Sequence, residues 1–166
     1  MQDPQALYEK VLALLDQNSV EYKLFSHKEA LTYEEIESVQ KESGFFGREM
    51  KCMVLKGEDF FVYVTLQGNR VNMEAIKERV GAKKVRLALP EELAEQFGAK
   101  PGCAYPFGFD ARFPIYVDPQ IFEEEWLLFS PVLPTKTVQA KGADLKKLFE
   151  DLENKVEEVS NFNKAA

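Results

Sequence analysis

The sequence has few of the residues from which disulfide frameworks and metal sites are built. Its 166 residues include two cysteines, Cys52 and Cys103, and one histidine, His27. Two cysteines do not make a disulfide framework, and together with one histidine they are too few ligands for a Cys/His zinc site. We therefore expect a reduced, cytoplasmic protein that uses no metal and no other cofactor.

Long apolar runs and targeting signals are also missing. No stretch approaches 18 uncharged apolar residues, so no transmembrane helix and no membrane partner are predicted. The first four residues include one acidic and no basic side chain, and the N-terminus does not resemble the basic and apolar regions of a signal peptide. The 45% hydrophobic content, with 13 phenylalanines, is enough to bury a core and excludes wholesale disorder.

Basic residues are in the minority, with 21 against 28 acidic residues and a net charge of −7. This balance argues against general nucleic-acid binding, including DNA binding, because neutralisation of phosphates supplies most of that affinity. The stretch from Arg70 to Arg86 is the exception, since it is locally basic. It is either a solvated helix face or a small nucleic-acid contact, and the sequence leaves both open.

Standard catalytic motifs are absent as well. The sequence contains no phosphate-binding glycine-rich loop and no Gly-x-Ser-x-Gly elbow. A Ser-His-Asp triad would depend on His27, and nothing near it in the sequence supports one. Any chemistry must therefore come from a less common arrangement.

The hydrophobic pattern predicts helices and strands that alternate along the chain. Helices are expected at residues 4–18, 32–43, 72–80, 90–97 and 142–159, and strands at residues 22–25, 50–55, 60–66, 85–88, 113–117, 126–129 and 135–140. Residues 60–66 are almost all apolar or β-branched, which is typical of a central strand. The order favours an α/β (α+β) fold, in which a mixed β-sheet is surrounded by helices in a single domain over residues 1–166.

The helix at residues 32–43 has the clearest local signals. Thr32 with Glu35 forms a capping box, and Leu31 with Ile36 forms a hydrophobic staple around the first turn. Gly44 is expected to end the helix.

Lys51 is the first unusual residue, because it interrupts the apolar strand at residues 50–55. Strand alternation places Lys51 on one face with Met53 and Leu55, and Cys52 on the other. Its ammonium could bind a carbonyl or phosphate oxygen in a pocket, or it could extend along the surface into solvent.

The second unusual feature is the loop from Gly102 to Gly108, which is rich in glycine and proline. Glycine permits backbone angles that other residues avoid and lets a ligand come close. The loop could direct free backbone amides at an oxyanion or ester, or it could be a rigid surface turn.

These features, in this order, resemble the YbaK/prolyl-tRNA synthetase editing-domain family of aminoacyl-tRNA deacylases. The resemblance covers roughly residues 20–149, with the helix at 142–159 at its end. It rests on a strand lysine at Lys51, a Gly-x-x-x-Pro loop from Gly102 to Pro106, the His27…Thr32 spacing, and Tyr116-Val117-Asp118 after the loop.

The resemblance implies a hydrolase that cleaves the ester of mischarged tRNA, a trans-editing activity toward small amino acids such as Cys, Ala or Pro on tRNA for proline. It implies that Lys51 and Gly102 are catalytic. The implied substrate-binding residues are His27, Thr32, Tyr105, Pro106, Phe107, Gly108 and Ser130. For the tRNA, the basic stretch and its surroundings offer Arg48, Lys56, Arg70, Lys83 and Lys84, and an aminoacyl-tRNA synthetase is a possible partner.

One segment departs from the family. Members commonly carry Ser-Ala-Gly or Asn-Ala-Gly where this chain has Ser130-Pro131-Val132, and the two larger residues are expected to stiffen and fill the pocket wall. The alternative function is therefore a module that binds an aminoacyl-tRNA or amino acid without hydrolysis, or an inactive interaction domain. For two residues a structural role also suffices: His27 could orient the helix start, and Thr32 could act only as its N-cap.

Overall fold

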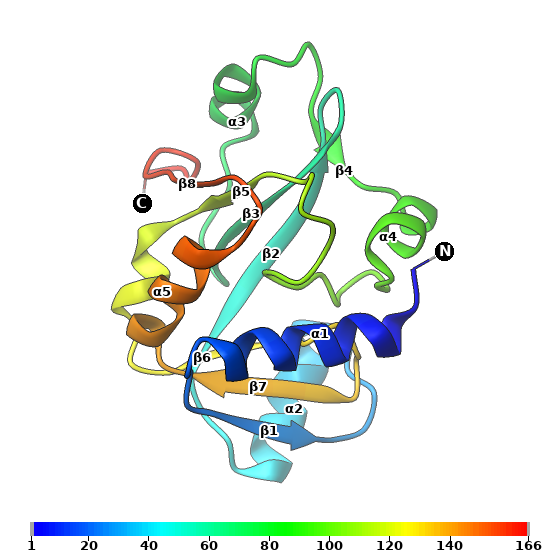
Figure 1. The fold of residues 1–166 in the computed structure, drawn as a ribbon, viewed down its shortest axis with the longest axis vertical. Helices are drawn as coiled ribbons and strands as arrows, with labels where there is room; N and C mark the ends of the chain where they lie inside the picture. The colour runs from blue at the N-terminus through cyan, green and yellow to red at the C-terminus, as the bar shows by residue number, and fades with distance from the viewer. Residues whose placement is uncertain (1, 166) are drawn as a thin grey trace.

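The fold is built on a mixed β-sheet with helices packed around it (Figure 1). The computed structural model describes residues 2–165. The strands are β1 (Tyr22–Ser26), β2 (Arg48–Lys56), β3 (Phe60–Leu66), β4 (Arg86–Leu87), β5 (Ile115–Val117), β6 (Leu127–Phe129), β7 (Lys136–Ala140) and β8 (Val156–Glu158). The helices are α1 (Pro4–Gln17), α2 (Tyr33–Ser43), α3 (Met73–Val80), α4 (Pro90–Phe97), α5 (Gly142–Asp151) and the 3₁₀ helix η1 (Pro119–Glu123). The predicted mixed α/β class is confirmed.

The order of the strands is β1-β7-β6-β2-β3-β5-β8, with β4 added to β2. The long strand β2 joins two halves of this sheet. It is antiparallel to β3 over residues 50–56, but it pairs with β6 only at Arg48 and Glu49 and with β4 only at Leu55 and Lys56. Between these contacts, one edge of β2 faces a break in the sheet.

The helices cover the sheet on both faces. Figure 1 shows α1 running alongside β7, with the paler α2 behind β7 and β1. Val11 and Leu15 of α1 belong to the large core cluster with Val138 of β7, whereas Val39 of α2 packs in a separate cluster with Leu128 of β6. The two faces of the part of the sheet formed by β1, β7 and β6 therefore bury different sets of side chains.

The alternation predicted for β2 is confirmed by the clusters. Met50 and Val54 are buried in the large core cluster, whereas Leu55 and Met53 pack in a second cluster with Tyr63 of β3. All seven residues of β3 are buried, as expected for a central strand.

The N-cap and the glycine stop predicted for α2 are confirmed, whereas the Glu35 side chain accepts from the Leu31 N–H instead of the Thr32 N–H that a capping box requires. The Thr32 hydroxyl accepts a hydrogen bond from the Glu35 N–H at 3.1 Å, and Glu35 accepts one from the Leu31 N–H at 3.2 Å. Gly44 ends the helix with a φ of 75°, a left-handed conformation that suits glycine.

The helix predicted at residues 142–159 is wrong in its second half. Helix α5 ends at Asp151, and β8 then pairs in parallel with the edge strand β5. The Asn154 side chain donates to the Asp110 and Phe113 carbonyls at 3.0 and 2.9 Å, so it fixes the chain against a distant loop. This tertiary contact and the free edge of β5 overcome the helical periodicity.

Within residues 2–165, none of the helices combines the length and the apolar character that crossing a bilayer requires.

Candidate functional site

A cavity of about 270 Å³ lies at the break between β2 and β6. Its walls come from four segments that are distant in sequence: the start of α2, the strand β2, the loop after α4, and the region from the end of β6 into β7. The lining residues are Ala30, Leu31, Thr32, Tyr33, Ile36, Glu49, Met50, Cys52, Gly102, Ala104, Phe129, Ser130, Pro134, Lys136 and Thr137. The cavity therefore brings together Thr32, Gly102 and Ser130, three of the residues predicted for the site.

The backbone of β2 contributes to this cavity. The Glu49 carbonyl accepts from the Gln67 N–H at 2.9 Å, which places Glu49 in a hydrogen-bonded pair of the antiparallel β2–β3 ladder. Because such pairs alternate, the peptide groups of Cys52 point away from β3 and toward the break in the sheet. The strand thus presents backbone polar groups as well as side chains to the cavity.

The amino end of α2 lies beside the cavity, through Thr32 and Tyr33. Thr32 has the N-cap role that the sequence left open, since its hydroxyl accepts from the Glu35 N–H. The first N–H groups of a helix carry a partial positive charge, which stabilises negative charge placed near them.

Two residues of the predicted loop line the cavity. These residues are Gly102 and Ala104. Within residues 2–165, their backbone N–H groups do not donate to any backbone carbonyl. Gly102 has a φ of +90°, and a Cβ on it would overlap the Leu31 carbonyl oxygen. Only glycine fits this close approach between the loop and the segment before α2.

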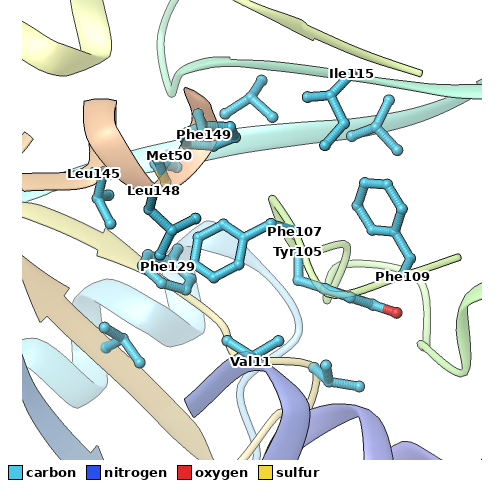
Figure 2. Packing of buried hydrophobic residues seen from close by; sticks show 14 of the residues in the cluster. Val11, Met50, Tyr105, Phe107, Phe109, Ile115, Phe129, Leu145, Leu148 and Phe149 are labelled. Atoms are coloured by element: carbon cyan, nitrogen blue, oxygen red, sulfur yellow. The ribbon is translucent and has the colours of Figure 1, made fainter. Parts of the chain in front are cut away.

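The rest of the loop lies in the core, away from the cavity lining. Figure 2 shows the Phe107 ring beside Phe129 and Leu148, and the Tyr105 ring near Phe109. The Tyr105 hydroxyl donates to the Phe97 carbonyl at 2.7 Å. The structure therefore does not bring the predicted contacts Tyr105, Pro106, Phe107 and Gly108 to the cavity. The loop is neither a surface turn nor a fully exposed set of amides, because its apolar side chains anchor it.

Substitution of Gly102 by alanine is expected to lower both stability and activity. A left-handed backbone costs alanine roughly 1–2 kcal/mol, and the overlap with Leu31 adds to this cost. Gly68→Ala is the matched control, because Gly68 has a φ of +99° and nothing within 4 Å of its Cβ position. Urea unfolding of both variants measures the difference. Equal losses of stability in the two would show that the Leu31 contact does not constrain the loop.

His27 supports the cavity wall from behind. Its Nε2 lies 2.8 Å from the hydroxyl of Thr137, a buried residue that lines the cavity, and its Nδ1 lies 2.7 Å from the Lys28 carbonyl. His27 itself is not among the lining residues. The structure thus places it as a neighbour that orients Thr137.

The segment Ser130-Pro131-Val132 only partly forms the cavity wall. Ser130 lines the cavity and donates to the Leu133 carbonyl at 3.1 Å, whereas Val132 is buried in the core cluster. Val132 has a φ of 76°, a left-handed conformation that is rare for a β-branched residue. The expectation that Pro131 and Val132 fill the wall is wrong, because the turn carries Val132 into the core; Ser130 and Pro134 form that wall.

Lys51 does not line the cavity. Its amine donates to the Asn69 carbonyl at 3.3 Å, and its side chain is partly buried. None of the ion pairs formed within residues 2–165 includes it. The cation that does line the cavity is Lys136, whose amine lies 2.6 Å from the Ser26 hydroxyl. In this conformation, Lys51 and the Gly102 loop do not face each other across the cavity.

Glu49 is the main residue that the sequence did not reveal. It lines the cavity, and its Oε1 is buried without a hydrogen-bond partner within residues 2–165. Burial raises the pKa of the Glu49 carboxyl to about 8. Burial also raises the pKa of the neighbouring Cys52 thiol, and to about 11 that of Cys103, so neither cysteine is an activated nucleophile at neutral pH.

The predicted tRNA contacts fall into separate places. Lys56, Lys83 and Lys84 line a second hollow of about 430 Å³, together with Lys77 and Arg86 and one acidic residue, Glu74. We call this the basic hollow. Two of its cations are already paired, since Lys56 and Arg86 contact Glu92 at 3.4 and 2.7 Å.

The other two predicted contacts lie outside the basic hollow. Arg70 is exposed after β3, and Arg48 lies at the opposite end of β2, paired with Glu124 at 3.3 Å. Seven residue steps of β2 separate Glu49 at the cavity from Lys56 at the basic hollow, or about 23 Å.

The chain is similar to several known proteins. A family profile described as the aminoacyl-tRNA editing domain matches residues 27–148. The chain is 35% identical over 88 residues to a proline–tRNA ligase of Bacillus velezensis, covering 50% of this chain and 16% of that protein. It is 22% identical over 143 residues to the prolyl-tRNA editing protein ProX of Acetoanaerobium sticklandii, covering 83% and 87% of the two chains.

A solved structure described as a candidate trans-editing enzyme for prolyl-tRNA synthetase has the same fold. Its TM-score is 0.71 at 21% identity, and the match covers 96% of this chain and 98% of that one. The chain spans about one sixth of the length of the proline–tRNA ligases it matches.

Proposed function

The chain belongs to the aminoacyl-tRNA editing domain family, and we propose that it is a trans-editing hydrolase of mischarged tRNA. The bond cleaved is the ester between a small amino acid and the terminal ribose, on tRNA for proline. Residues 1–166 act as a single domain in the cytoplasm, with an aminoacyl-tRNA synthetase as a further partner.

One observation carries this proposal: the cavity at the break between β2 and β6, which Gly102, Thr32 and Ser130 enter from three distant segments. Its volume of about 270 Å³ is below the range of roughly 300–1,000 Å³ typical for drug-sized ligands. That size suits a small aminoacyl group. Size exclusion provides the specificity, since one methylene changes binding by only about 1–3 kcal/mol.

The reaction is attack of water on the ester carbonyl. In this proposal, the N–H groups of Gly102 and Ala104 and of the amino end of α2, which all belong to residues at the cavity, stabilise the negative charge that develops on the carbonyl oxygen. The ribose hydroxyl of the substrate assists the water, so a protein nucleophile is not required.

Lys51 is proposed to supply a cation to the same oxygen or to the terminal nucleotide. It lies two residues from Glu49 on the same face of β2, about 6.6 Å along the strand. Its hydrogen bond to the Asn69 carbonyl is long, at 3.3 Å, and its flexible four-carbon stem allows the amine to leave Asn69 when substrate binds.

The proposal is tested by incubation of the purified protein with a panel of tRNAs charged with alanine, cysteine, proline and larger amino acids. The decrease in esterified tRNA with time measures the release of the amino acid. We expect the protein to hydrolyse mischarged tRNAs that carry small amino acids and to leave tRNAs that carry larger amino acids intact. Binding without hydrolysis would instead support the non-hydrolytic module, and neither binding nor hydrolysis would support an interaction domain.

The basic hollow is proposed to bind phosphates of the acceptor stem. Reversal of charge at Lys83 and Lys84 is expected to raise KM about tenfold and to reduce the slope of log K against log salt by about 1 to 2. The matched control reverses Lys146 and Lys147 of α5, an adjacent exposed pair. Steady-state kinetics at several salt concentrations measure both effects. An unchanged KM in the Lys83 and Lys84 variant would remove the basic hollow from tRNA binding.

A further inference from the structure

One oxygen of the Glu49 side chain is unusual, because residues 2–165 provide no partner for it. Its Oε1 is buried and has no hydrogen-bond donor within residues 2–165. Leaving a buried polar oxygen without a partner destabilises a folded protein, so such an oxygen calls for an explanation. The cavity offers one, because Glu49 is among the residues that line it.

Among residues 2–165, no cation forms an ion pair with Glu49. The side chain lies between the cavity and a shallow hollow lined by Tyr33, Glu37 and Gln40 of α2 and by Gln67. Arg48, the adjacent basic residue, is held by Glu124 and by the Gln67 carbonyl. An acceptor without a cation in a partly enclosed cavity is suited to a ligand that brings its own positive charge.

An aminoacyl ester carries such a charge on its α-ammonium group, which is bonded to the carbon next to the reacting carbonyl. We propose that the Glu49 carboxylate binds the α-ammonium group of the aminoacyl ester and so makes this cavity selective for a free amino group. This inference rests on the proposed function. Binding of the cation also lowers the pKa of Glu49 from about 8, because a nearby positive charge favours the ionised carboxylate.

The test compares two substrates that differ only at this group. Alanyl-tRNA for proline and lactyl-tRNA for proline, which nitrous acid makes from it, have an amine and a hydroxyl at the same carbon. Each rate is divided by the spontaneous hydrolysis of the same ester, because the ammonium group activates the ester by itself. We expect the protein to prefer the alanyl ester about ten- to hundredfold in kcat/KM.

Glu49→Gln keeps the shape of the side chain and removes its charge. We expect this variant to lose the preference, with a ratio of the two esters near one, mainly through a higher KM for the alanyl ester. Glu49→Asp keeps the charge on a shorter side chain and is expected to retain part of the preference. A Glu49→Gln variant that slows both esters equally would overturn the proposal and make Glu49 a general base or a structural residue.

A binding measurement separates this inference from the proposed function. The probes are 3′-deoxyadenosines that carry alanine or lactate through a 3′-amide, which cannot be hydrolysed as an ester. The protein could hydrolyse neither ester and still bind the alanyl amide more tightly than the lactyl amide. If Glu49→Gln removes that difference in binding, the hydrolase proposal fails and the Glu49 inference holds. Equal binding of the two amides by the unmodified protein would overturn the inference, whatever the outcome for hydrolysis.

Discussion

Replacement of Lys51 by alanine is expected to lower the rate of aminoacyl-tRNA hydrolysis by a factor on the order of 10²–10³, with the fold unchanged. Removal of one group that stabilises an oxyanion in the transition state usually has an effect of this size. The side chain is only partly buried and its hydrogen bond to the Asn69 carbonyl is long, at 3.3 Å, so its loss should cost little stability. Single-turnover hydrolysis of alanyl-tRNA measures the rate, and thermal unfolding checks the fold.

Lys136→Ala is the matched control for this prediction. Lys136 lines the cavity, but the Ser26 hydroxyl holds its amine at 2.6 Å. We expect a loss of less than tenfold for this variant. If Lys51→Ala retains near-normal turnover while Lys136→Ala loses a hundredfold or more, the catalytic cation is Lys136.

The second large effect concerns stability and arises from Glu49. The unfolded carboxyl loses its proton near pH 4.5, whereas the folded one keeps it until about pH 8. Between these values the folded state binds more protons, so each unit of rising pH lowers the free energy of unfolding by up to about 1.4 kcal/mol. From about pH 5 to pH 8, the expected loss amounts to as much as about 4 kcal/mol.

Glu49→Gln isolates this contribution, because glutamine does not titrate. The variant and the unmodified protein should have similar stability near pH 5, and the variant should be more stable near pH 8. The other titratable groups that face Glu49 do not mask this difference. Burial raises the pKa of Tyr33 to about 12 and raises that of Cys52 as well, so neither group titrates between pH 5 and pH 8. Glu37 and Arg48 are present in both proteins and contribute equally to the two profiles. Urea unfolding at a series of pH values measures it. Parallel pH profiles would contradict the raised pKa.

Features set by neighbouring residues could be predicted from the sequence. The N-cap bond of Thr32 and the stop at Gly44 depend on contacts within one turn of helix, and both are present. The faces of β2 follow from strand alternation alone. The order of strand lysine and glycine loop was also enough to identify the family by resemblance.

Features set by distant contacts could not be predicted. The loop after Gly102 buries Phe107 against Phe129 and Phe149, residues that the sequence does not mark as its neighbours. The end of α5 depends on Asn154 reaching Asp110 and Phe113. Glu49 is not among the residues predicted for the site, because only the packing of α2 over β2 makes its position unusual. The signal available was its place two residues before Lys51 on the same face.

The pairing of β2 has a consequence for the length of the substrate. β2 is held to β3 over residues 50–56, and β3 is buried along its whole length, so the cavity end and the basic hollow end cannot move independently. The strand is thus a rigid spacer of about 23 Å between ester and phosphates. An aminoacylated nucleoside is too short to occupy both ends, whereas a charged acceptor stem can, which gives the intact tRNA a binding advantage that no change in the cavity alone could supply.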